Sequence, residues 1–107
     1  MTAKRRRRPP KRENVLAVVA EHLDAGTYLD TRHALERRTE RQITRPEVLH
    51  VLRRGRHEKR KDDFREEYGS WTYAIRGKTI DGRDLRICVS FDDEVGMIII
   101  TAISLDA

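Results

Sequence analysis

The chain has 107 residues, of which 37% are hydrophobic and 38% are charged. This length fits one domain with a modest core and a strongly charged surface, and leaves no room for a second core. The single cysteine excludes an internal disulfide, and no cysteine–histidine cluster has the spacing of a zinc site. Because the longest apolar run, Met97–Ile100, is far too short to cross a membrane, we expect a cytoplasmic protein that acts without a membrane, metal or cofactor.

The net charge of +5 is unevenly distributed along the chain. Residues 1–12 contain seven lysines and arginines and no acidic residue. Residues 31–61 carry a net charge of +7, whereas residues 62–107 carry −5. A polyanion such as RNA is therefore expected to meet the tail and residues 31–61.

The basic tail combines repelling like charges with two adjacent prolines. We therefore predict that residues 1–12 are disordered in the free protein and that residues 13–107 form a single domain. Two roles remain open for such a tail. It is either an arm that binds nucleic acid or a partner, or a solvated chain end that only aids solubility.

Three helices are predicted in the N-terminal half. Apolar residues at helical spacing indicate a helix over residues 13–24, which a glycine ends. Thr31 can cap a second helix that continues to about Arg41. The third helix begins at the capping-box pattern Thr44–Glu47, which has a proline in the first turn, and ends at Gly55.

Strand patterns dominate the C-terminal half. Residues 57–61 fit a charged edge strand, and residues 62–68 fit either a loop or a single helical turn. After Gly69 the residues alternate with the period of two that is typical of strands. This pattern predicts three further strands, at residues 71–76, 85–91 and 97–103. Asp81-Gly82 is a strong hairpin-turn signal. Both faces of the last strand are apolar, so we expect it to be central and covered on both sides.

These elements predict an α+β domain. Two to three N-terminal helices are expected to pack on one face of a three- to four-stranded antiparallel sheet. The expected core joins the apolar helix stripes to one side of the last strand and to Leu85, Ile87, Val89 and Phe91. Cys88, in the middle of a strand, is interpreted as a small buried residue rather than a nucleophile.

Basic residues on the predicted sheet indicate a phosphate-binding face. Alternation places Arg76, Lys78 and Arg86 where they can project to solvent, near Lys59 and Lys61 if the edge strand forms. Such cations can bind an RNA backbone and stabilise the charge on a phosphate during its transfer.

RNA can be cleaved without a metal when its own 2′-hydroxyl is the nucleophile. The reaction then needs a proton acceptor, a proton donor and cations on the phosphate, and the candidates are His33, His57, Tyr73 and the lysines. Each candidate has a structural alternative. A histidine such as His33 often packs or caps near a helix start, and Arg37 and Arg86 could pair with the acidic run Asp92–Glu94.

Several short motifs resemble a bacterial domain of unknown function found in toxin–antitoxin-like loci. They lie between residues 14 and 104 and comprise Thr31–Arg37, Gln42–Thr44, Val51–Gly55, Tyr73–Gly77 and Val89–Asp93. The order of elements also resembles the MqsR branch of the RelE-like mRNA interferases. In that branch, a helix ending in Ala-Gly and a helix containing Thr-Arg precede the sheet, as Asp24–Gly26 and Thr31-Arg32 do here.

The resemblance implies a RelE-like fold and a toxin that cleaves mRNA without a metal, either free or on the ribosome. It also implies a cognate antitoxin protein that neutralises the toxin. The chain departs from the MqsR pattern at three positions. Thr72 follows Trp71 where a glutamine is expected, Asp84 replaces a tyrosine, and a lysine close to the C-terminus is absent.

Together, the residues and the resemblance predict an endoribonuclease site. Arg76 and Arg86 would hold the phosphate, Lys61 would assist, and His33 or Tyr73 would transfer protons. The expected nucleic-acid contacts are Arg37, Arg53, Arg54, Lys59 and Lys78. The alternative is a non-catalytic module that binds a protein or a nucleic acid.

Overall fold

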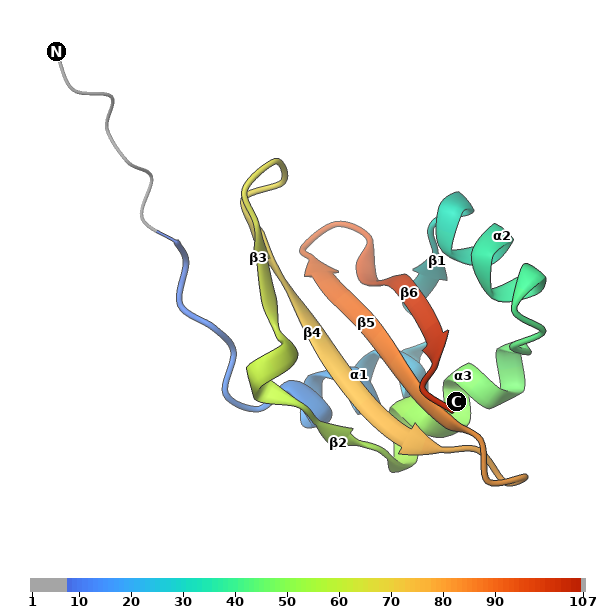
Figure 1. The fold of residues 1–107 in the computed structure, drawn as a ribbon. Helices are drawn as coiled ribbons and strands as arrows, with labels where there is room; N and C mark the ends of the chain where they lie inside the picture. Colours follow the sequence, from blue (N-terminus) through green and yellow to red (C-terminus); the bar gives the residue numbers. More distant parts are fainter. Residues whose placement is uncertain (1–7, 107) are drawn as a thin grey trace, which may run out of the picture.

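The computed structural model describes residues 8–106, which contain three α-helices and a six-stranded sheet (Figure 1). The strand order is β1-β6-β5-β4-β2, and β3 also pairs with β4. The elements are α1 (Val15–Ala25), β1 (Tyr28–Asp30), α2 (Arg32–Glu40), α3 (Arg45–Arg54), β2 (Arg56–His57), the 3₁₀ helix η1 (Lys59–Lys61), β3 (Asp63–Arg65), β4 (Ser70–Lys78), β5 (Asp84–Asp92) and β6 (Gly96–Ser104).

The predicted α+β class is confirmed, but the predicted three- to four-stranded antiparallel sheet is wrong. The sheet is mixed, because β1 pairs in parallel with β6 while β4, β5 and β6 form an antiparallel meander. Two short strands outside the expected set account for the difference in number. β1 and β3 have three residues each, and such lengths are too short to show a period of two in a sequence.

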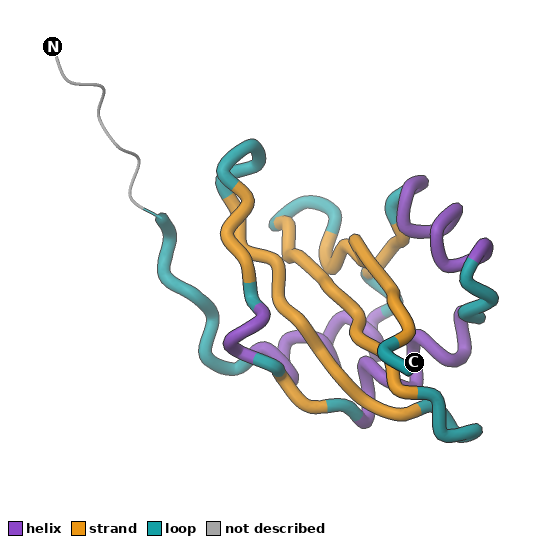
Figure 2. The backbone as a smooth tube through the Cα atoms, in the orientation of Figure 1, coloured by secondary structure: helices purple, strands orange, loops and turns teal. Residues whose placement is uncertain are grey.

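Helices α1 and α3 cover one face of the sheet and lie behind it in Figures 1 and 2. Their apolar stripes pack against alternate residues of the strands, as expected for Leu85, Ile87 and Val89. The fully buried core side chains include Val15, Val19, Val48, Val51, Leu52, Ile75, Leu85, Ile87, Val89, Met97 and Ile99.

Helix α2 lies at the β6 edge of the sheet, away from α1. It has few apolar residues, and polar contacts help to hold it in place. Arg38, only 8% exposed, pairs with Asp30 and donates from Nη1 to the Ile43 carbonyl at 3.2 Å. Arg41 donates to the Ala102 carbonyl of β6 at 2.9 Å. These contacts fix the C-terminal half of α2 against β1 and β6.

The predicted helix caps are confirmed. The Thr31 hydroxyl accepts a hydrogen bond from the Ala34 amide, and Thr44 forms both bonds of a capping box with Glu47. A capping side chain satisfies a backbone amide that the first helical turn leaves unpaired, and each cap typically contributes about 1 kcal/mol. Local chemistry therefore sets where α2 and α3 begin.

Residues 56–68 differ from the expected edge strand over 57–61. Pairing with β4 stops after His57, and the chain turns through η1 before β3 resumes the pairing. The Asp62 side chain explains the interruption, because its Oδ1 atom accepts the Ala74 amide at 3.0 Å. A carboxylate thus replaces the backbone carbonyl that a continuous strand would have supplied.

Strand β6 is covered on one side only, contrary to expectation. Met97, Ile99 and Ala102 are buried beneath the helices, whereas Ile98 and Ile100 are partly exposed on the other side. The face of the sheet opposite α1 and α3 is therefore accessible. We call it the open face; it carries alternate residues of β4, β5 and β6, including Thr72, Arg76, Arg86, Ser90 and Ile98.

The predicted tail is described from residue 8 onward, and residues 1–7 lie outside the described residues. Residues 8–12 run beside β3 and η1 (Figure 1). Trp71 Nε1 donates to the Pro9 carbonyl at 2.7 Å, and Lys11 Nζ lies 2.8 Å from Asp62 Oδ2. The predicted disorder of residues 1–12 stays a prediction, and Pro9 and Lys11 of this tail contact the domain.

Candidate functional site

The open face brings together two of the predicted phosphate ligands. Arg76 of β4 and Arg86 of β5 are direct partners in the strand register, so their side chains project from the same face. Both side chains meet Glu58, which follows β2. Arg86 Nε lies 2.7 Å from Glu58 Oε1, and Arg76 Nη1 lies 3.4 Å from Glu58 Oε2.

Asp84 completes this ionic network. Its carboxylate forms two hydrogen bonds with Arg76, at 3.1 Å to Nε and 2.6 Å to Nη2. The Glu58 side chain is only 7% exposed, so its charge depends on these arginines for solvation. The ion pair that sequence allowed for Arg86 therefore exists, but its partner is Glu58 rather than the run Asp92–Glu94.

The network shifts the protonation equilibria of its members. Hydrogen bonding and charge from Arg86, and then from Arg76, hold the pKa of Glu58 below its ordinary value of 4.5. Arg76 likewise lowers the pKa of Asp84, and the Asp84 carboxylate raises the pKa of Arg76. The four groups are consequently all ionised near neutral pH, and the two carboxylates offset much of the positive charge of Arg76 and Arg86.

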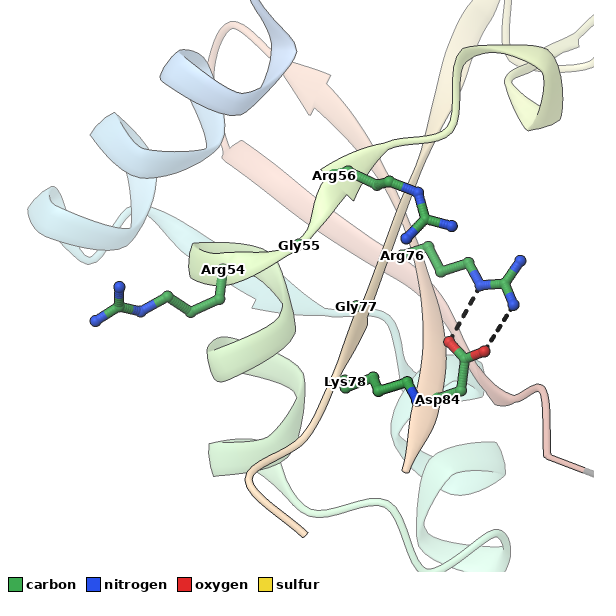
Figure 3. Close-up of a pocket in the computed structure, with 7 residues that line it drawn as sticks. All are labelled: Arg54, Gly55, Arg56, Arg76, Gly77, Lys78 and Asp84. Atoms are coloured by element: carbon green, nitrogen blue, oxygen red, sulfur yellow. Dashed lines mark hydrogen bonds and ion pairs between the residues drawn. The ribbon is translucent and has the colours of Figure 1, made fainter. Parts of the chain in front are cut away.

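A pocket of about 550 Å³ adjoins the network where α3, β2, β4 and β5 meet (Figure 3). We call it the basic corner; its lining residues are Arg54, Gly55, Arg56, Arg76, Gly77, Lys78 and Asp84. Figure 3 shows the Arg56 side chain extending toward Arg76, whereas Arg54 points away from the Arg76–Asp84 pair. The corner therefore unites Arg76 with Lys78, as predicted, and adds Arg56.

Two glycines allow the end of α3 to lie against β4 at this corner. A Cβ atom on Gly77 would be 2.9 Å from the Cα atom of Gly55. A Cβ atom on Gly55 would be 2.6 Å from the Arg76 and Val51 carbonyl oxygens. Any larger residue would force these segments apart, so the floor of the corner is bare backbone.

The remaining predicted catalytic residues are dispersed. Tyr73 is 3% exposed on the helix-covered face, where its hydroxyl accepts the Arg12 amide at 3.0 Å. Lys61 is exposed on η1, and His33 is exposed on α2. Tyr73 thus lies on the opposite face from Arg76 and Arg86, and the structure does not assemble these five residues into one site.

The other predicted nucleic-acid contacts are also spread over the surface. Arg37 pairs with Glu40 at 3.8 Å on α2, and Arg53 pairs with Asp24 at 3.0 Å between α3 and α1. Lys59 lies beside Lys61 on η1 and is exposed. Of this group, only Arg54 and Lys78 line the same pocket.

A groove of about 650 Å³ lies at the opposite end of the open face from the basic corner. We call it the His33 groove; it is lined by Thr31, His33, Arg65, Tyr68, Ser70, Thr72, Ser90, Phe91, Asp92, Ile98 and Ile100. His33 from α2 and Arg65 and Tyr68 from the β3–β4 hairpin border it. The groove therefore combines an imidazole, a phenol and a guanidinium above a floor containing isoleucines and hydroxyls.

The polar side chains of the groove differ in the hydrogen bonds and ion pairs that they already form within the protein. Thr72 Oγ1 donates to the Asp63 carbonyl and Ser90 Oγ donates to the Trp71 carbonyl, both at 3.1 Å, so these hydroxyls retain only acceptor capacity. Arg65 pairs with Glu67 through Nε at 2.7 Å. Within residues 8–106, the His33 imidazole has no hydrogen-bond partner, which leaves it available to a ligand.

Sequence reasoning missed Arg65 and Tyr68 because residues 62–68 fitted a loop or a helical turn. One signal in the sequence identifies them. Phe64 alternates with Asp63 and Arg65 just as Trp71 alternates with Ser70 and Thr72, which is the pattern of a hairpin around residues 66–69. In the structure, Arg65 pairs with Ser70 across that hairpin.

Cys88 and possible metal ligands are further candidates within residues 8–106. Burial raises the pKa of the Cys88 thiol, which disfavours the nucleophilic thiolate. Across residues 8–106, no three histidine, cysteine or acidic side chains are grouped so as to hold a metal ion. Nor does any helix in that range have the length and apolarity to span a membrane.

A family model described as a domain of unknown function, DUF4258, matches residues 31–104. The chain belongs to this family. The DUF4258 match runs from the Thr31 cap of α2 to the last residue of β6, so it includes the basic corner and the His33 groove. The expectation of a domain of unknown function is thus confirmed, whereas the match carries no link to toxins. No curated protein and no solved structure matches the chain.

Proposed function

We propose that this DUF4258 domain is a metal-independent endoribonuclease that cleaves RNA in the His33 groove. The observation that carries the proposal is that His33, Tyr68 and Arg65 line one groove on the open face. An acceptor, a donor and a cation are the groups that intramolecular cleavage of RNA requires.

The proposed reaction needs only these side chains and the RNA. His33 removes the proton from a 2′-hydroxyl, whose oxygen then forms a bond to the adjacent phosphorus. The bond from phosphorus to the 5′-oxygen breaks, and Tyr68 gives its proton to that oxygen. Arg65 offsets the negative charge that develops on the phosphate. The products are a 2′,3′-cyclic phosphate and a 5′-hydroxyl end.

The groove also offers contacts for the nucleosides. Ile98 and Ile100 provide an apolar floor, and the ring of Tyr68 provides a surface on which a base stacks. The hydroxyls of Thr72 and Ser90 retain lone pairs that can accept hydrogen bonds from a base or a ribose. These features favour a single strand with splayed bases over a duplex.

This proposal keeps His33 from the predicted site and replaces Arg76 and Arg86 with Arg65 as the cation on the phosphate. The reason is electrostatic. Glu58 and Asp84 already neutralise Arg76 and Arg86, whereas among residues 8–106 Arg65 pairs only with Glu67 on the exposed hairpin. A phosphate at Arg65 therefore displaces fewer interactions.

The biological setting is part of the same proposal and rests on the resemblance of the short motifs to RelE/MqsR-like toxins. In that setting, the chain acts in the cytoplasm on mRNA, either free or on the ribosome. A cognate antitoxin protein would bind it and block the open face. Helices followed by an antiparallel meander agree with the order of elements in that group.

The test is cleavage of a labelled single-stranded RNA by the purified chain in EDTA. The intact protein is expected to produce 5′-hydroxyl ends, and His33→Ala is expected to lower the rate about 100-fold or more. Arg32→Ala is the matched control, because Arg32 is the exposed neighbour of His33 and pairs only with Glu36. Equal cleavage by the intact protein and His33→Ala would contradict the proposed site.

A non-catalytic nucleic-acid-binding module is the second candidate. It is favoured by Arg56 and Lys78, two exposed cations of the basic corner that form no ion pair within residues 8–106. This alternative predicts that the chain retains RNA at low salt and leaves it uncut at every protein concentration. The cleavage assay therefore separates the two functions.

A further inference from the structure

We infer that the basic corner is a phosphate-binding subsite for an RNA strand that extends along the open face from the His33 groove. The inference rests on the proposed function, and it assigns the corner to a phosphate remote from the one that is cleaved. Arg56 and Lys78 are its main ligands, and Arg76 supports them.

The cationic side chains of the basic corner are exposed and available to a ligand. Arg56 and Lys78 are exposed, and neither has an ion-pair partner within residues 8–106. Arg76 uses three of its five N–H groups on Asp84 and Glu58, so two remain for a ligand. The corner can thus accept a phosphate without breaking an existing contact.

The negative groups near the corner limit its charge but do not cancel it. Asp84 and Glu58 balance Arg76 and Arg86, and Asp106 Oδ2 accepts the Asp84 amide at 3.0 Å on the other side. Arg56 and Lys78 therefore give this end of the open face a net positive charge. They also lower the pKa of Asp84, after the larger effect of Arg76, which places their charge close to the pocket.

The lining of the pocket favours an anion over an apolar group. Gly55 and Gly77 leave the floor without side chains, and the whole pocket has a volume of about 550 Å³. Its lining contains no large apolar residue. A phosphate matches this combination of a bare floor and cationic sides, whereas a protein hot spot normally offers an apolar anchor.

The path from the corner to the groove runs along the open face and passes over the Glu58–Arg86 ion pair. Arg76 and Ser70 lie on the same face of β4 and are six residues apart, a distance of about 20 Å at about 3.3 Å per residue. The adjacent row across the sheet consists of Ala74, Cys88 and Thr101, which are all small. An extended RNA strand of several nucleotides can therefore reach from the groove to the corner.

The experiment compares two RNAs with the same cleavable step: a dinucleotide, which fills only the groove, and a strand of about twelve nucleotides. Arg56→Gln plus Lys78→Gln is expected to raise KM for the long RNA about tenfold and to leave kcat unchanged. Both parameters for the dinucleotide should stay as in the intact protein. Arg32→Gln plus Arg60→Gln, an equal charge change elsewhere on the surface, is the control.

A binding measurement tests the corner independently of cleavage. A 2′-O-methyl strand of the same length lacks the nucleophile, so its Kd reports binding even if the chain cleaves nothing. The double variant should weaken this Kd about tenfold and reduce the slope of log Kd against log salt by about 1 to 2. An unchanged Kd and slope, or an equal loss in the control variant, would overturn the subsite.

Discussion

The two ends of the open face use charge in different ways. At the basic corner, Arg76 and Arg86 are held by Glu58 and Asp84 in contacts of 2.6 to 3.4 Å, and the Glu58 side chain is almost inaccessible. At the other end, His33 and Tyr68 are exposed beside a groove. The corner network ties β2 to β4 and β5, whereas the groove residues are exposed and open to a ligand.

This contrast teaches that a basic residue on a sheet is not by itself a phosphate ligand. Arg76 and Arg86 lie on the face that alternation predicts, yet each is first a partner of a carboxylate. The same face carries other cationic side chains that form fewer ion pairs with carboxylates, namely Arg56, Arg65 and Lys78. Substitutions at the corner network should therefore reduce stability, and substitutions at the groove should reduce activity.

The largest effect on stability is expected from Glu58→Gln. The change removes the charge that holds Arg76 and Arg86, and we expect it to lower the free energy of unfolding by about 2–3 kcal/mol at pH 7. This figure is below that for a fully buried pair, because the two arginines remain partly exposed. Urea denaturation measures it, and a change below about 0.5 kcal/mol would show that the network has no structural role.

The pH dependence sharpens the same test. The arginines lower the pKa of Glu58 in the folded state, so its contribution to stability is fully present above the ordinary value of 4.5. That contribution is lost as the pH falls through the lower, folded-state pKa. The stability difference between the intact protein and Glu58→Gln should therefore be largest near neutral pH and shrink below pH 4.5. A difference that grows on acidification would contradict the account.

Gly55→Ala is expected to have the next largest effect. Its new methyl group would meet backbone oxygens at 2.6 Å, and backbone cannot move aside as a side chain can. We expect a loss of about 1–3 kcal/mol in the free energy of unfolding, measured by thermal or urea denaturation. Arg54→Ala, at the exposed neighbouring position, should change it by less than about 0.5 kcal/mol. Equal stability of the two variants would refute the close approach of α3 and β4.

Of Glu58→Gln, Gly55→Ala and Ser90→Ala, the last should have the smallest effect on the free energy of unfolding. The hydroxyl donates one hydrogen bond to the Trp71 carbonyl, and its loss should lower the free energy of unfolding by about 0.5–1.5 kcal/mol. The groove should otherwise keep its shape, since alanine removes one atom and adds none. Denaturation curves provide the measurement. A loss above about 3 kcal/mol would mean that the groove end of the open face contributes as much to stability as the basic corner does.

Much of the fold was predictable from local chemistry. Thr31 and Thr44 carry their capping signals within four residues, and Leu85, Ile87 and Val89 show a clear period of two. The short strand β1 was not predictable, because it depends on a partner far along the chain, and β2 is shorter than the edge strand expected over 57–61. The open side of β6 was also missed, since Ile98 and Ile100 are apolar but remain partly exposed.

The site was less predictable than the fold. His33 and the pairing of Arg76 with Arg86 follow from local patterns, but the role of Glu58 does not. Glu58 reaches the arginines because β2 pairs with β4 and the Glu58 amide donates to the Ala74 carbonyl at 2.8 Å, which places its side chain on the face of Arg76. Ion pairs that form only in the folded chain determine which arginines are neutralised by carboxylates. A local sequence pattern does not reveal these ion pairs.

The most direct test of the contrast between the two ends compares His33→Ala with Arg86→Ala. RNA cleavage in EDTA should be measured per folded molecule, together with the free energy of unfolding of each variant. We predict that His33→Ala loses cleavage about 100-fold or more with stability unchanged within about 0.5 kcal/mol. Arg86→Ala should lose stability and keep the cleavage rate of its folded fraction. The opposite pattern, a folded but inactive Arg86→Ala and an active His33→Ala, would contradict the account.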